Sequence, residues 1–347
     1  MKEYKYFDFF SGIGGFKLAA DRVVSGSFKL LHAGYCEIDT IARQVYEAAH
    51  LNGHSTQKIN DITEVKTKKN KSGILLDDFD IMFGGFPCQS FSNVGYRKGL
   101  DDERGMLFYN ILDILDKYLP KYFVLENVQK LSTIKKGELL SEMKKALETI
   151  GKGYHLHIWD LLASDYGLPQ KRKRLFFCGV RSDISTKNDL SEPPKIDLSK
   201  TKYPTTWHLL EKDTVDKKHY IPTKTRNTVL YKNPKWMGDV KIDNLIARPI
   251  TASMSKWHRA NQDNYFSNSF IKSKTPLAIE EIDLEKEPIR RITPLEGFRI
   301  QGFPDSFSKT TQSLKISYSA QYRLIGNAVP VELAYSVINH FLASYHE

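Results

Sequence analysis

Cysteine is scarce in this chain, which has only three among its 347 residues: Cys36, Cys88 and Cys178. They are widely separated and form no C-x-x-C pair, so the spacing indicates neither a disulfide framework nor a zinc site. We therefore expect no metal, and a reducing compartment such as the cytoplasm.

Long apolar runs are also missing. No stretch approaches the roughly 18 apolar residues that a membrane-spanning helix needs. The first ten residues, MKEYKYFDFF, lack the apolar centre and small-residue cleavage site of a signal peptide. Hydrophobic residues make up 41% of the chain and charged residues 27%, which is ordinary for a globular protein. We expect a globular protein that is neither exported nor held in a membrane.

Acidic side chains are in the minority, with 41 Asp and Glu against 51 Lys and Arg, so the formal net charge is +10. Such an excess favours a polyanionic partner, because contacts with phosphates release counterions. Charge alone leaves a nucleic acid and a merely basic surface as equal alternatives.

The first 180 residues alternate between short β-rich runs and longer helical patterns. Strands are predicted over 4–10, 28–35, 79–83, 121–126, 155–161 and 174–180, with a further short one just before Asp61. Helices are predicted over 16–24, 40–50, 106–118 and 138–150. This alternation predicts an α/β fold with a Rossmann-like, mostly parallel sheet covered on both faces. Ligands of such sheets bind at the carboxyl ends of the strands.

The alternation dissolves between about residues 181 and 287, a stretch rich in Lys, Asn, Asp, Ser, Thr and Pro. It predicts a smaller, loop-rich, irregular β domain. Order returns after about residue 288, and a helical pattern covers 331–345. We therefore predict a discontinuous first domain, 1–185 plus 288–347, with a second domain, 186–287, inserted into it.

A glycine-rich turn, DFFSGIGGF (8–16), follows the first strand and opens the first helix. Gly12, Gly14 and Gly15 allow the backbone to turn tightly and to approach a ligand closely. The G-x-G-G spacing differs from the dinucleotide-binding fingerprint, because Lys17 stands where its last glycine belongs.

Two carboxylates follow the next two strands. Glu37 stands where an acidic side chain can accept hydrogen bonds from ribose hydroxyls. Asp61 stands where it can accept one from an adenine amino group. Together with the glycine turn they favour a nucleoside-containing cofactor, and the alternative is a plain strand–turn–helix with surface acids.

The segment GGFPCQSFSNVG (84–95) follows a buried strand. Pro87 removes a backbone donor and holds Phe86 extended, so Cys88 enters a constrained loop. A lone cysteine is more often a small buried hydrophobic residue. A glycine- and serine-rich loop at the carboxyl end of a sheet is a poor core position, however, and a good one for a nucleophile.

Six blocks in order along nearly the whole chain resemble the DNA (cytosine-5) methyltransferase family, of the bacterial restriction–modification type. They are DFFSGIGGF (8–16), GFPCQSFS (85–92), VLENV (124–128), QKRKRLFFCGV (170–180), RITPLEGFRIQGFPDSF (291–307) and YRLIGNAVP (322–330). The resemblance implies methyl transfer from S-adenosylmethionine, with S-adenosylhomocysteine as product, to carbon 5 of a cytosine flipped out of a specific duplex DNA sequence. It also implies that 186–287 is the target-recognition domain.

The residue types suit this chemistry. Carbon 5 of cytosine is a poor nucleophile until a thiolate adds to carbon 6 and leaves an enamine. The resemblance makes Cys88 that nucleophile, forming a covalent bond to carbon 6. Glu126 resembles the residue that hydrogen-bonds or protonates ring nitrogen 3. Its alternative role is that of a strand-end acid capping a helix.

Gln170, Arg172 and Arg174 are spaced two apart. In an extended chain they point to one face, while Lys171 and Lys173 point to the other. Guanidinium groups on that face can contact the cytosine carbonyl oxygen and hold catalytic carboxylates, so Arg172 and Arg174 are predicted to be catalytic. A solvated basic run is the alternative.

The resemblance also assigns binding residues. Those expected to contact the cofactor are Phe10, Gly12, Ile13, Gly14, Gly15, Glu37, Ile38, Asp61, Ile62, Pro87, Asn327 and Val329. Those expected to contact nucleic acid are Gln89, Ser92, Gln170 and Thr251. Phe10 is expected to pack on the adenine, with an ordinary core role as the alternative. Many relatives have an aromatic residue in place of Ile38, so stacking of the cofactor on Ile38 is expected to be aliphatic. Family members often carry a serine in place of Ala328, which has no side-chain hydroxyl.

Three other functions compete with this one. They are cytosine-5 methylation of transfer RNA, catalytically inactive binding of nucleic acid, and nicotinamide-dependent oxidoreduction. The block at 90–108 looks more like bacterial DNA enzymes, intact Cys88, Glu126 and Arg174 argue against an inactive relative, and the G-x-G-G spacing argues against the oxidoreductase. We expect a monomer in the bacterial cytosol, associated with the nucleoid. It would act on double-stranded DNA, with a cognate restriction endonuclease as a candidate partner.

Overall fold

The computed structural model describes residues 1–51, 53–87, 106–185, 189–230, 241–276 and 282–345. By its internal contacts the chain forms two compact units. The first comprises Met1–Leu161, Lys173–Pro194 and Ala334–Glu347, and the second comprises Leu162–Arg172 and Lys195–Leu333. Within the described residues, no helix combines the length and the apolar character needed to cross a membrane.

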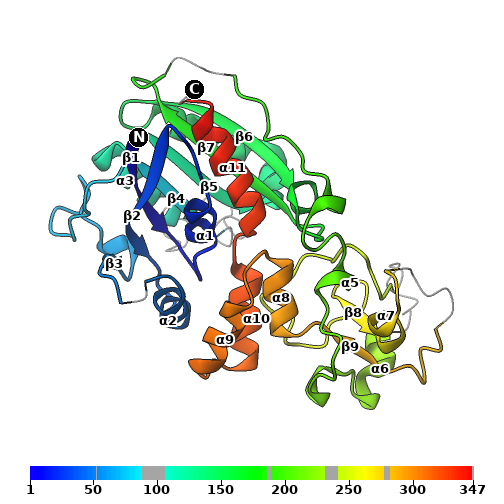
Figure 1. The fold of residues 1–347 in the computed structure, drawn as a ribbon. Coiled ribbons are helices and arrows are strands. Elements are labelled where there is room, and N and C mark those ends of the chain that lie inside the picture. The colour runs from blue at the N-terminus through cyan, green and yellow to red at the C-terminus, as the bar shows by residue number, and fades with distance from the viewer. Residues whose placement is uncertain (52, 88–105, 186–188, 231–240, 277–281, 346–347) are drawn as a thin grey trace. The chain divides into compact units, whose positions relative to one another are not determined.

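The first unit is built on a seven-stranded sheet with the order β3-β2-β1-β4-β5-β7-β6 (Figure 1). The strands are β1 (Lys2–Phe9), β2 (Phe28–Cys36), β3 (Gln57–Ile59), β4 (Ile81–Gly85), β5 (Tyr122–Val128), β6 (Tyr154–Leu162) and β7 (Lys173–Arg181). The five strands β1 to β5 pair in parallel, and β7 pairs antiparallel to β5. The predicted α/β fold with a mostly parallel sheet is confirmed.

The helices of this unit follow the predicted pattern. They are α1 (Gly15–Asp21), α2 (Thr40–Tyr46), α3 (Met106–Tyr118), α4 (Glu138–Thr149) and α11 (Val331–Ala343). Two predicted helices differ: the one over 16–24 ends at Asp21, and the one over 40–50 continues after Tyr46 as a π-helical turn, η1 (Glu47–Leu51). Asp39 fixes the start of α2 by accepting hydrogen bonds from the backbone N–H groups of Ile41 and Ala42.

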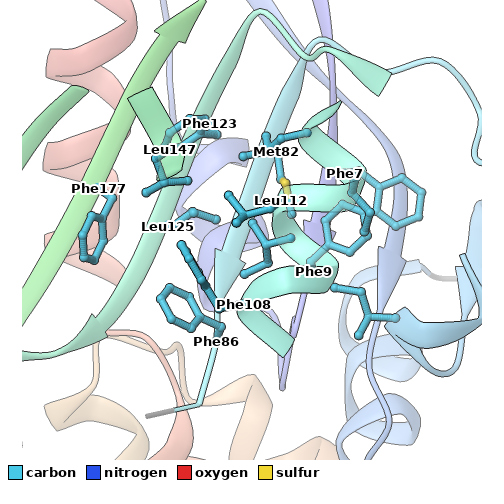
Figure 2. Packing of buried hydrophobic residues seen from close by; sticks show 14 of the residues in the cluster. Phe7, Phe9, Met82, Phe86, Phe108, Leu112, Phe123, Leu125, Leu147 and Phe177 are labelled. Atoms are coloured by element: carbon cyan, nitrogen blue, oxygen red, sulfur yellow. The ribbon is translucent and has the colours of Figure 1, made fainter. Parts of the chain in front are cut away.

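Helices cover both faces of the sheet, as predicted. Figure 2 shows the apolar cluster on the face that α3 and α4 cover. Its labelled members are Phe7, Phe9, Met82, Phe86, Phe108, Leu112, Phe123, Leu125, Leu147 and Phe177. On the opposite face the ring of Phe16 from α1 stacks on Phe83, and Phe341 from α11 packs edge-on against Tyr122. Central strands buried on both faces explain the near-continuous apolar runs in the sequence.

The second unit contains little sheet. Its helices are α5 (Thr206–Leu209), α6 (Thr223–Leu230), α7 (Asn268–Lys272), α8 (Pro294–Ile300), α9 (Ser306–Ser313) and α10 (Tyr318–Asn327). The strands β8 (Tyr265–Ser267) and β9 (Ile289–Arg291) form one antiparallel pair. Loops therefore dominate 181–287 as predicted, but the expected β character was wrong, since β8 is the one strand among the described residues of 186–287. Polar side chains that bond to the local backbone favour turns over ladders.

The compact units differ from the predicted domains in three stretches: 162–172 and 288–333 group with the inserted segment, and 186–194 groups with the first unit. For 288–333 the cause is visible at Arg290, whose buried guanidinium binds both carboxylate oxygens of Glu296 at 2.6 and 2.8 Å. That guanidinium also donates to the backbone carbonyl of Glu211, so α8 is tied to residues of the inserted segment. The predicted domain boundaries separate a catalytic part from a target-recognition part, and that functional division stays a prediction.

Candidate active site

The glycine-rich turn after β1 adopts left-handed backbone geometry, with a φ of 53° at Phe10, 55° at Gly12 and 87° at Gly14. The N–H of Gly14 donates to the carbonyl of Ser11 at 2.8 Å, which closes the turn before α1 begins. A Cβ atom at Gly12 would have no atom within 4 Å, so this side of the turn is open. Left-handed geometry at a residue such as Phe10 is unfavourable and is typical of functional sites.

Glu37, directly after β2, holds this turn. Its Oε2 accepts a hydrogen bond from the Gly12 N–H at 2.7 Å, and its Oε1 accepts one from the Asp39 N–H at 2.8 Å. Burial raises the pKa of the Glu37 carboxyl, although both N–H bonds favour the charged form. Each carboxylate oxygen keeps a second lone pair for a ligand hydroxyl.

The ends of the neighbouring strands bring the other predicted cofactor residues to the same edge. Phe9 lies beside Cys36, and Cys36 beside Ile59, in the parallel ladder. Asp61 therefore follows β3 at this edge, where its carboxylate accepts from the Thr63 N–H at 2.9 Å. Ile38 is 68% exposed there.

These residues fit a nucleoside-containing methyl donor. The turn is open on one side, Glu37 offers acceptors for hydroxyl groups, and exposed Ile38 offers an apolar surface for a flat ring. Ile13 and Ile62, which neighbour Gly14 and Asp61 in the chain, are buried. Among the side chains that the structure describes, no group of three or more His, Cys, Asp and Glu is placed to hold a metal ion.

Glu126 on β5 and Arg174 on β7 form an ion pair, with 2.5 Å between Arg174 Nε and Glu126 Oε1. Both side chains are nearly buried, being 10% and 12% exposed. In the antiparallel register Glu126 lies opposite Phe176, so Arg174 is its diagonal neighbour. The structure thus brings together two of the residues that the sequence predicted to be catalytic.

Asn127, which sequence reasoning missed, fixes the chain that leads to Cys88. Its buried side chain donates from Nδ2 to the carbonyl of Phe86 at 3.0 Å, and its Oδ1 accepts from the Val128 N–H at 2.8 Å. Pro87, which follows, is exposed. An amide next to the predicted catalytic acid, at the end of a buried strand, was the available indication in the sequence.

Cys88, Gln89 and Ser92 lie outside the described residues. The other two cysteines, Cys36 and Cys178, are buried, and burial raises the pKa of both thiols. A thiol that stays protonated is a poor nucleophile. Of the three cysteines in the sequence, Cys36 and Cys178 are therefore unsuited to covalent catalysis.

The predicted alternation along 170–174 is confirmed, since Gln170 and Arg172 are buried while Lys171 and Lys173 are exposed. The guanidinium of Arg172 donates to three backbone carbonyls of the second unit. They are those of Ile250 at 2.8 Å, Gly326 at 2.8 Å and Ala328 at 3.2 Å. A catalytic role for Arg172 stays a prediction, and these bonds describe a residue that positions the backbone.

Gln170 is equally enclosed. Its Oε1 accepts from the Ile250 N–H at 3.2 Å, and its Nε2 donates to Gln301 Oε1 at 3.2 Å. Its predicted contact with nucleic acid stays a prediction, as does that of Thr251, which is exposed. Together Gln170 and Arg172 tie the segment 248–254 to α8 and to the end of α10.

Two further residues that were predicted to contact the cofactor, Asn327 and Val329, lie in the same region of the second unit. Asn327, the last residue of α10, is exposed, and Val329 is buried. The backbone of Thr251 and Ala252 packs directly on Gly326, where a Cβ atom would lie only 2.3 Å from the Ala252 nitrogen. The segment 248–254 and the block YRLIGNAVP (322–330) are therefore one packed assembly.

The family model for C-5 cytosine-specific DNA methylases matches residues 4–343. The chain belongs to this family. Type II methyltransferase M1.ScrFI of Lactococcus lactis subsp. cremoris is 32% identical to it over 351 residues, which cover 98% of this chain and 78% of that relative. Type II methyltransferase M.HpaII of Haemophilus parainfluenzae is 30% identical over 342 residues, covering 95% and 87%.

Solved structures show the same fold at lower identity. The Entamoeba histolytica methyltransferase EhMeth has a TM-score of 0.73 at 20% identity and covers 100% of both chains. The S. pombe Dnmt2 methyltransferase has a TM-score of 0.72 at 20% identity, covering 98% of this chain and 99% of its own. The resemblance drawn from six sequence blocks is confirmed, and this DNA methylase family and its fold support S-adenosylmethionine as the methyl donor.

Proposed function

We propose that this DNA methylase acts on a cytosine flipped out of a specific duplex DNA sequence, through a covalent bond between Cys88 Sγ and carbon 6. The observation that carries the proposal is the buried Glu126–Arg174 pair, next to the Asn127 amide that anchors the chain before Cys88. An oriented carboxyl group close to the chain that leads to Cys88 supports the proposed division of roles.

Each residue has a distinct part in the proposed reaction. The Cys88 thiolate adds to carbon 6, and the electron pair displaced from the ring double bond makes carbon 5 nucleophilic. Glu126, held by Arg174, relieves the charge that develops on the ring at nitrogen 3. S-adenosylmethionine, when bound, would supply an electrophilic methyl group to carbon 5, with cleavage of its sulfur–methyl bond and S-adenosylhomocysteine as the leaving group. Loss of the carbon 5 proton and expulsion of the thiolate then restore the aromatic ring.

DNA is the proposed substrate rather than transfer RNA. Both curated relatives named above are type II methyltransferases, and the chain carries a net charge of +10. The likeness to the Dnmt2 structure concerns the fold and does not favour either substrate. Methyl transfer from labelled S-adenosylmethionine to duplex DNA and to transfer RNA, measured side by side, decides between them, and labelling of transfer RNA alone would overturn the proposal.

The covalent step is tested with duplex DNA that carries 5-fluorocytosine at the target. Wild-type protein should become trapped on it, because fluorine cannot leave carbon 5 as the proton does. Cys88→Ser should bind S-adenosylhomocysteine normally but neither turn over nor trap, since an alkoxide is far harder to form than a thiolate near neutral pH. Turnover by the wild type without any trapped species would exclude the covalent intermediate.

We further propose that 186–287 reads the DNA sequence and that 1–185 with 288–347 carries the chemistry. Exposed Thr251, in RPITASM (248–254), supports this, because base readout needs polar side chains at the surface. Exchange of 186–287 for the matching segment of a relative with another specificity should change the methylated sequence and not the reaction. A folded chimera that keeps the original specificity would place recognition elsewhere.

The same proposal covers the partners. A DNA methylase of this kind would work as a monomer in the bacterial cytosol, at the nucleoid, and would protect sites that a cognate restriction endonuclease cuts. The type II relatives support this setting. Bisulfite sequencing of host DNA, combined with digestion by candidate endonucleases, tests it directly.

A further inference from the structure

A partly buried histidine, His50, contacts the glycine-rich turn of the first unit. The Nε2 atom of His50 is 2.9 Å from the carbonyl oxygen of Ile13. A carbonyl oxygen only accepts, so the ring must carry its proton on Nε2 and donate it. Burial lowers the pKa of His50 to about 4, so the ring is neutral at pH 7 and this tautomer is defined.

The same ring fills the space beside the next residue. A Cβ atom at Gly14 would lie 2.1 Å from His50 Nε2 and 2.7 Å from Cδ2. Gly14 also has a φ of 87°, which disfavours any side chain. Glycine is therefore needed at this position both for its backbone geometry and for the room that His50 occupies.

The placement of His50 depends on an irregularity in the helix. It lies in the π-helical turn η1 (Glu47–Leu51), which extends α2. π-Helical turns are rare in proteins overall, and many of those that occur lie at functional sites. Tyr46 supports the ring, with 4.7 Å between the ring centres, and the Tyr46 hydroxyl is itself bonded to His32 Nε2 at 3.1 Å.

The turn is thus held from two sides by the same segment of chain. Glu37, just before α2, accepts the Gly12 N–H, and His50, just after α2, donates to the Ile13 carbonyl. Two peptide groups of the turn, separated by one other, are fixed by side chains 25 and 37 residues away. A turn that is ordered before the ligand arrives loses less entropy on binding.

We propose that His50 is a positioning residue for the methyl donor, acting through Ile13 and Gly14 and not by touching the donor itself. This inference rests on the use of S-adenosylmethionine at the turn. It predicts that the His50 side chain sets the affinity for the donor without taking part in DNA binding or in the chemical step.

The test uses the full-length protein and three variants. In His50→Gln the side-chain amide can still donate to Ile13, in His50→Phe the ring remains but the donor is lost, and His54→Ala removes an exposed histidine nearby as the matched control. Dissociation constants for S-adenosylhomocysteine come from titration calorimetry and those for DNA from fluorescence anisotropy. KM for S-adenosylmethionine and kcat are measured at saturating DNA.

His50→Phe should weaken binding of S-adenosylhomocysteine and raise KM for S-adenosylmethionine by about tenfold, as expected for one partly buried hydrogen bond and a displaced turn. DNA affinity and kcat at saturating donor should stay within about twofold. His50→Gln should recover most of the affinity, and His54→Ala should match the wild type.

Equal affinity of His50→Phe and wild type for S-adenosylhomocysteine would overturn the inference. So would a parallel loss of donor and DNA affinity together with a lowered melting temperature, because that pattern belongs to a purely structural residue. If the wild type itself binds no S-adenosylhomocysteine, the proposed use of this donor fails instead. A His50→Phe variant that does not fold leaves His50→Gln to decide, through its donor affinity relative to the wild type.

Discussion

Two carboxyl groups of the first unit, those of Glu126 and Asp8, are buried in different surroundings. Glu126 is nearly buried but paired with Arg174. Asp8, on β1, is 0% exposed, and neither of its carboxylate oxygens has a hydrogen-bond partner among the described residues. Burial raises the pKa of Asp8 well above its usual value. The nearby charge of Glu37 adds to this effect, and Lys17 partly opposes it. Folding therefore favours the protonated form of Asp8.

This protonation predicts a pH-dependent stability. Between about pH 4, the usual pKa of an aspartate in an unfolded chain, and the raised pKa of Asp8 in the folded chain, unfolding releases the Asp8 proton, so the free energy of unfolding falls as pH rises. The slope is about 1.4 kcal/mol per pH unit for one proton. Asp8→Asn removes this slope. In urea unfolding at pH 5, 6.5 and 8, the free energy of unfolding of Asp8→Asn should rise relative to that of the wild type as the pH increases. If the free energies of unfolding of the variant and the wild type change in parallel with pH, Asp8 is ionised in the folded protein. Glu3→Gln, at an exposed position, serves as the control.

The paired acid leads to a kinetic prediction. Glu126→Gln keeps the shape of the side chain but removes the proton that general-acid assistance needs, so single-turnover methyl transfer should slow by about 100-fold or more. Binding of DNA and of S-adenosylhomocysteine should be retained. Near-normal single-turnover rates would give Glu126 a structural role beside Arg174.

The sequence predicted Glu126, Arg174 and the glycine turn because residue type and order along the chain identify them. Asn127 and His50 escaped prediction for a physical reason. Each acts through a partner about 40 positions away, on Phe86 and Ile13, and only the folded sheet brings those partners close. An ordinary helical histidine has no local feature that distinguishes it.

At the scale of elements, apolar patterns predicted the strands and helices of the first unit well, since buried central strands need continuous apolar runs. The second unit was harder to predict. Its order comes from buried polar side chains, such as Arg172 and Gln301, that bind backbone carbonyls at the end of α10. Such bonds leave no periodicity in the sequence.

The packing at the end of α10 is open to a direct test. In Gly326→Ala the new methyl group would meet the backbone of Thr251 and Ala252, which cannot move aside as a flexible side chain can. We expect a loss of stability of about 2 kcal/mol or more, measured by urea unfolding. Gly297→Ala in α8, where the nearest atom is a flexible Ile325 methyl group at 3.2 Å, is the control and should change stability little. Equal effects would contradict the packing described here.

At the scale of the whole molecule, the net charge of +10 predicts steeply salt-dependent DNA binding. The logarithm of affinity should fall with the logarithm of salt concentration by about 0.9 for each neutralised phosphate, so six contacts give a slope near −5. Fluorescence anisotropy between 50 and 200 mM salt measures it. A flat dependence would count against extensive phosphate contacts.

Helix α11 gives the first unit an unusual order of assembly during synthesis. Phe341 packs on Tyr122, and the Tyr345 hydroxyl is bonded to His157 Nε2 at 2.8 Å, so the last helix completes a sheet that was made much earlier. At 5–20 residues per second, the ribosome needs roughly 10 to 40 s to travel from Tyr122 to Phe341. Throughout that time the inserted unit is being made while the part of the sheet that α11 covers stays exposed. Nascent chains should therefore depend on chaperones until α11 has been made.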